Sequence, residues 1–177
     1  FAKPWWVNLF ILIPIILYFL WRKNKLKIPL NVLLIAGLFG AAFGFVAAVV
    51  VVYLRAATNT LPEYNPINTL NELSQNLFTI EIFREAATII MLLTIAILSI
   101  KSLKERFAVF LWTFATWDIF YYLGLWITIR WPSSLLAPDV LFLIPVPWIS
   151  QVWYPILVSA LTMLAIALNT KTQKSRT

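Results

Sequence analysis

One acidic residue, Asp118, lies near the middle of the very apolar segment TFATWDIFYYLGLW, residues 113–126. Tyr121 and Tyr122 follow it by three and four residues, so in a helix all three side chains share one face. A buried carboxylate beside phenols can accept hydrogen bonds, exchange a proton or bind a ligand. It can equally be a neutral or paired group that fixes the register of a helix, and the sequence leaves both roles open.

A second group of polar residues begins the next apolar segment upstream, TIEIFREAATI. Its members recur at helical spacing and predict a polar stripe on one face: Glu81, Arg84, Glu85 and Thr88. Because such a stripe is costly against lipid, we expect it to face the protein interior, a wet cavity or a partner. Further residues extend the predicted intramembrane cluster: Arg55, Asp118, Tyr121, Tyr122, Arg130 and Asp139. Within it we expect Asp118 to be satisfied by hydrogen bonds or by a basic group, with Arg84 the best candidate and Tyr122 the next.

The chain contains no cysteine and no histidine. Disulfides, thiolate nucleophiles and a histidine base are therefore excluded, as are Cys or His ligands for haem, iron–sulfur clusters and zinc. We predict no metal site and no cofactor from the sequence. A bound lipid, or a cofactor held by packing alone, stays compatible with it.

The composition places these polar residues in a membrane protein. The 177 residues are 62% hydrophobic and only 12% charged, against about 25% charged in soluble domains. The apolar residues come in blocks long enough to cross a bilayer, which takes about 20 residues. We predict an all-α fold, one transmembrane domain over residues 1–177. Five spans follow, at about 4–21, 30–54, 80–100, 107–129 and 151–168.

Basic residues predict the orientation of these spans. Ten of the 14 lysines and arginines fall in the loops after the first and third spans and in the tail. Because cytoplasmic loops are enriched in Lys and Arg, we expect the N-terminus outside and the C-terminus in the cytoplasm. The formal charge of +7 then reflects topology and lipid headgroups, and we expect no nucleic-acid partner.

The two outer loops show patterns of their own. Thr69 and Glu72 form a capping box, and leucines 70, 73 and 77 recur at helical spacing, which predicts a short interfacial helix. In the second outer loop the apolar run 140–144 is too short to cross a bilayer. It predicts an interfacial or re-entrant segment before Pro145 and Pro147.

Small residues recur every four positions in the second span: Ala36, Gly40, Gly44 and Ala48. This spacing forms a groove that allows another helix, a flat cofactor or a lipid tail to approach the backbone closely. Helix packing is the commoner use of such a groove, and we predict a packing face here.

Three motifs, FREAATI, WDIFYY and LFLIPVPW, coincide with the polar residues above. With them the chain resembles a family of uncharacterised multi-pass bacterial membrane proteins, over about residues 5–168. The resemblance implies a bacterial inner-membrane location and brings no activity.

Three functions are compatible with the sequence. The first is a non-catalytic subunit of a larger, bioenergetic bacterial membrane complex, packing on other subunits through the second span. The alternative is a small carrier or receptor for an anionic or lipid-like ligand that uses the polar cluster. The third is a membrane enzyme with Asp118 or Glu85 as acid or base. It ranks last, because no serine or tyrosine nucleophile has a recognisable partner motif.

The predicted topology can be tested because the natural chain has no cysteine. We expect an impermeant thiol reagent on intact cells to label the variant Ser74→Cys and to spare Ser175→Cys. Labelling at position 175 alone would reverse the orientation and place the polar cluster on the cytoplasmic side.

Overall fold

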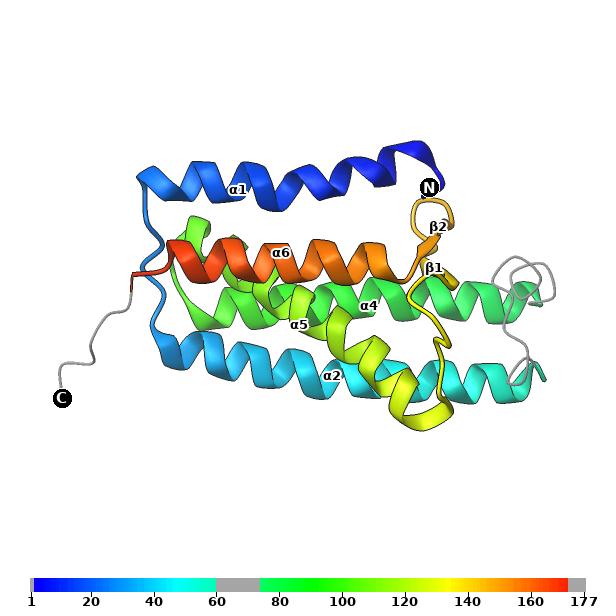
Figure 1. Ribbon diagram of the computed structural model, residues 1–177. Helices are drawn as coiled ribbons and strands as arrows, with labels where there is room; N and C mark the ends of the chain where they lie inside the picture. Colours follow the sequence, from blue (N-terminus) through cyan, green and yellow to red (C-terminus); the bar gives the residue numbers. More distant parts are fainter. Residues whose placement is uncertain (1, 60–73, 172–177) are drawn as a thin grey trace.

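The computed structural model describes residues 2–59 and 74–171, and within them the chain forms a helical bundle (Figure 1). The elements are η1 (Trp5–Ile11), α1 (Leu12–Lys23), α2 (Leu30–Ala57), α4 (Gln75–Ser99), α5 (Leu103–Ile129), β1 (Pro138–Phe142), β2 (Trp148–Gln151) and α6 (Trp153–Asn169). These helices overlap the five predicted spans. Among the described residues, the continuous helical segment of η1 and α1 and the helices α2, α4 and α5 are long and apolar enough to cross a membrane.

Local sequence signals account for the ends of these helices. Pro29 precedes α2 in an extended conformation, and Ser74 begins α4 by accepting a hydrogen bond on its side-chain oxygen from the amide of Leu77 at 3.4 Å. The chain leaves α5 through Arg130, which has a left-handed φ of 56°. Pro132 then follows within two residues and cannot continue a helix.

The helices alternate in direction, so the loops gather at two ends of the bundle (Figure 1). At one end Lys104 Nζ donates to the carbonyl oxygens of Asn24 and Lys25, both at 3.1 Å, which joins the two basic loops. At the other end residue Lys3 pairs with Ile149 of β2 through two backbone hydrogen bonds of 2.8 Å. The described ends of the chain therefore lie at opposite ends of the bundle.

The all-α prediction is wrong at the second outer loop. Residues 138–142 and 148–151 form a two-stranded antiparallel hairpin, β1–β2, with an irregularity between Val140 and Phe142. The predicted interfacial or re-entrant segment is thus largely a β-strand. A hairpin pairs the backbone polar groups of a short apolar run with each other, which a single extended segment cannot do. Of the interfacial helix predicted around Thr69 and Glu72, residues 69–73 lie outside the described part of the chain, and Leu77 belongs to α4.

The closest helix packing joins α2 and α5. A Cβ atom added to Gly40 would lie 2.7 Å from the carbonyl oxygen of Thr113, and one added to Gly44 would collide with the carbonyl oxygen of Trp117. Ala36 and Ala48 of the same face are buried. The small-residue face of α2 therefore packs as a helix contact, and its partner is α5 of the same chain.

We expect Gly44→Leu to destabilise the folded protein by about 1–3 kcal/mol or more, because the added side chain overpacks the α2–α5 contact. Ala42→Leu is the matched control, since residue 42 of the same helix is exposed. The midpoint of thermal unfolding in detergent measures both variants. Equal midpoints for Gly44→Leu and the parent would show that the close approach of the two helices adds nothing to stability.

Candidate functional site

The polar residues predicted from the sequence lie mostly inside the bundle, near the end that carries the hairpin. Arg55 and Asp139 are 2% and 1% exposed, and Glu81, Glu85, Asp118 and Tyr122 are buried as well. The side chain of Arg84 is half-buried, at 25% exposed. Arg130 is placed differently: it is exposed, and its guanidinium lies 4.7 Å from the ring centroid of Trp126.

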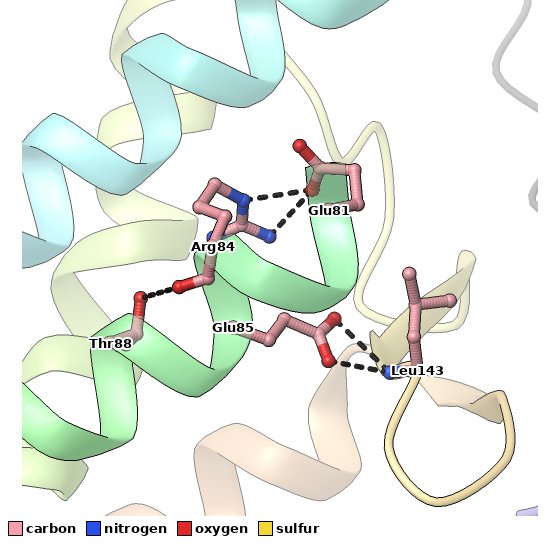
Figure 2. A network of polar contacts seen from close by, with 5 residues as sticks. All are labelled: Glu81, Arg84, Glu85, Thr88 and Leu143. Atoms are coloured by element: carbon pink, nitrogen blue, oxygen red, sulfur yellow. Dashed lines mark hydrogen bonds and ion pairs between the residues drawn. The ribbon is translucent and has the colours of Figure 1, made fainter. Parts of the chain in front are cut away.

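The acidic residues of α4 have separate partners (Figure 2). Glu81 accepts hydrogen bonds from Nε and a terminal nitrogen of Arg84, both at 2.8 Å. Glu85 points the other way, toward the hairpin. Its two carboxylate oxygens accept from the backbone amide of Leu143 at 2.8 and 3.1 Å. The fourth polar residue of this face, Thr88, donates back to the carbonyl oxygen of Arg84 at 3.0 Å.

Asp118 faces the interior, as its tyrosine neighbours predict, but its expected partner is wrong. Ser159 Oγ of α6 donates to Asp118 Oδ2 at 2.8 Å. Arg84 is engaged with Glu81, and the Tyr122 hydroxyl donates to Asp139 Oδ2 at 3.0 Å. The reason is geometric: α6 packs directly against α5, whereas Arg84 turns toward the acidic residue three positions before it on its own helix.

Arg55 completes the polar region from the end of α2. Its guanidinium carbon lies 4.1 Å from the ring centroid of Trp131, an arrangement typical of a cation–π contact. Trp131 also lies near Tyr122, with ring centroids 6.4 Å apart. The last turn of α2, the last turns of α5 and the start of the hairpin loop therefore meet in one buried region.

A cavity of about 570 Å³ lies beside this region. Its walls come from η1 and α1, from α4, from α5 and α6, and from the hairpin. It exists because α4 packs mainly on α5 and slightly on α2, while α1 packs on α6. The space between these two sets of helices is not filled by side chains. Its volume falls within the range of about 300–1,000 Å³ that is typical of small-molecule sites.

The polar side chains that line the cavity lie mostly in the half nearer the hairpin, among apolar residues of the hairpin itself, and the other half is largely apolar. Toward the hairpin it presents Arg84, Glu85, Thr88, Asp118, Tyr121, Tyr122 and Ser159. Farther along the helices the lining is largely apolar, with Ile89 and Ile90 on α4 facing Phe110 and Leu111 on α5. Ile13 of α1 and Ile90 of α4 line the cavity and are also 37% and 63% exposed. The apolar end is therefore open on the side of the bundle.

Sequence reasoning missed three contributors to this site. Ser159 and Thr162 lie three residues apart on α6, share a helical face and line the cavity. That spacing was a usable signal, since both are polar residues in an otherwise apolar helix. The amide of Leu143, in contrast, had no signal at all, because any residue carries a backbone amide and only the hairpin brings this one to Glu85.

Chemically, the site offers acceptors and hydroxyl groups. Among the described residues no three His, Cys, Asp or Glu residues lie close enough together to hold a metal ion. The Ser159–Asp118 pair holds a hydroxyl and a carboxylate in direct contact, without the imidazole that activates serine in hydrolases. The arrangement is suited to binding a molecule through hydrogen bonds at one end and apolar contacts at the other.

Comparisons of the whole chain with known protein families, with curated proteins and with solved structures give no match. The site is therefore interpreted from its own geometry.

The Glu85 contact generates a prediction about the hairpin. Glu85→Leu removes the carboxylate that accepts from the buried Leu143 amide, and leaving that amide unsatisfied should cost about 1–3 kcal/mol. We expect faster amide hydrogen exchange at residues 138–151 in this variant. Glu85→Gln is the control, because its amide oxygen can still accept. If exchange in the hairpin is the same in Glu85→Leu as in the parent, Glu85 does not anchor it.

Proposed function

We propose that this protein is a binding protein or carrier for a lipid-like amphiphile, held in the cavity between α4 and α1–α6. The observation that carries the proposal is that the polar side chains of one cavity gather in its half nearer the hairpin, whereas its other half is largely apolar and opens beside Ile13 and Ile90. A molecule with a polar head and a hydrocarbon tail fits both ends at once. Entry from the side also suits a ligand that is itself dissolved in the bilayer.

The proposal includes five crossings of a bacterial inner membrane, with the N-terminus outside. The helix α6 has 17 residues and spans about 25 Å at 1.5 Å per residue, slightly less than a typical hydrocarbon core. It packs against α1 and α5 along the bundle, which supports a crossing of the same membrane. In this orientation the hairpin and the polar end of the cavity lie in the outer half of the bilayer.

The alternative of an accessory subunit in a bioenergetic complex is less well supported. Its expected contact surface was the small-residue face of α2, and α5 of the same chain covers that face at Gly40 and Gly44. A partner subunit would have to use another surface. The two proposals differ in what should accompany the purified protein, namely a small amphiphile or defined partner proteins.

A tryptophan placed in the cavity separates these proposals. In native mass spectrometry from a mild non-ionic detergent, we expect the parent to retain a bound amphiphile. Ala86→Trp should lose it, because residue 86 lines the cavity and the larger side chain fills the space. Ala87→Trp should retain it, since residue 87 is exposed on the outer face of the same helix.

Two results would contradict the proposed function. One is retention of the same adduct by Ala86→Trp, which would place the bound molecule elsewhere. The other is a parent protein with no small-molecule adduct that migrates together with defined partner proteins, which would favour the subunit.

A further inference from the structure

We propose that the head of the bound amphiphile is a hydrogen-bond donor, an ammonium or a hydroxyl group, and that Asp118 is the residue that accepts from it. This inference rests on the proposed function and deepens it by naming the chemistry of the ligand. It distinguishes this cavity from a site for phosphate or carboxylate heads, which the arginines in the sequence favour.

One carboxylate oxygen of Asp118 is not used as a hydrogen-bond acceptor by any described residue. An ionised carboxylate has about four lone-pair positions for hydrogen bonds. Ser159 occupies one of them through Oδ2, and Oδ1 has no hydrogen-bond partner among residues 2–59 and 74–171. Asp118 lines the cavity and is 9% exposed although it lies in the middle of α5. Its open oxygen is therefore available to a molecule inside the cavity.

The neighbouring arginines already contact other side chains. Arg84, the one basic residue among the described residues that line the cavity, holds Glu81 at 2.8 Å through two nitrogens. Arg55 is buried against the ring of Trp131. An anionic head would have to compete for Arg84 and would lie beside Asp118 and Glu85. Like charges at short distance in an apolar interior are strongly unfavourable.

The other polar side chains that line the cavity near Asp118 also favour a head that donates hydrogen bonds. Tyr121 also lines the cavity, and its hydroxyl has no hydrogen bond with any described residue. A tyrosine hydroxyl can both donate and accept, so it can serve the oxygen of an alcohol as well as an ammonium group. Glu85 is less available, because both of its oxygens face the Leu143 amide. Asp118 is thus the acceptor best placed for the head.

The test compares three amphiphiles that share one tail: octadecylamine, octadecanol and octadecanoate. Each is titrated against the purified full chain in non-ionic detergent at neutral pH, and bound adducts are counted by native mass spectrometry. We expect the amine and the alcohol to bind, and octadecanoate to bind at least about tenfold more weakly, as expected for losing a charge-assisted hydrogen bond. Ala86→Trp should lose the binding of all three.

Variants at Asp118 distinguish the two donor heads. Asp118→Asn keeps an acceptor oxygen and loses the charge, so the amine should weaken about tenfold while the alcohol keeps its affinity. Asp118→Leu removes the acceptor and should weaken both. Ala87→Trp, on the exposed face of α4, is the control and should leave the binding of all three amphiphiles unchanged.

The outcomes separate this inference from the proposed function. If octadecanoate binds as tightly as the amine, or if Asp118→Leu leaves all three affinities unchanged, the head assignment is overturned. If Ala86→Trp abolishes the binding of the amphiphiles in that case, the cavity is still the site where the lipid-like molecule binds. If none of the three amphiphiles binds and the parent carries no adduct, the proposed function fails together with the inference.

Discussion

The close approach of α2 and α5 is the constraint on which the rest of the structure depends. At Gly40 and Gly44 the backbone of one helix rests against carbonyl oxygens of the other, which any side chain would prevent. In lipid there is little hydrophobic drive for helices to associate, so such backbone contacts and their dispersion energy carry much of the packing. Because this contact commits one face of α5 to α2, Asp118 and Tyr122 are directed away from α2, toward α6, the hairpin and the cavity.

A second constraint is that every buried charge requires a compensating partner. The protein provides these partners close to each charge. Each of three carboxylates accepts a hydrogen bond from a different kind of donor. Ser159 donates to Asp118, a backbone amide donates to Glu85, and Tyr122 donates to Asp139. Glu81 forms an ion pair with Arg84. The bonds of Glu85 and Tyr122 also hold the hairpin against α4 and α5.

The cavity follows from how the helices pair. One set joins α2, α4 and α5, and the other joins α1 to α6, with α5–α6 as the main contact between the sets. The hairpin covers the end of the space that remains between α4 and α1–α6. A tightly packed interior has few voids larger than a water molecule, so a space of this size beside unused acceptors is typical of a binding site.

The sequence by itself determined the helices and the faces that they bury. Apolar blocks, prolines and small-residue spacing act within one helix, so they located the five long helical segments of the described residues to within about five residues, and they located the packing face of α2. They also placed the polar residues inside. Tertiary structure alone decided which residues form hydrogen bonds with each other. Asp118 accepts from Ser159, forty-one positions away, and Glu85 accepts from a backbone amide. The hairpin at 138–151 was likewise missed, because strand pairing joins residues across a turn and leaves no helical period to detect. The cavity is a property of how helices are paired, and no local pattern of residues encodes that choice.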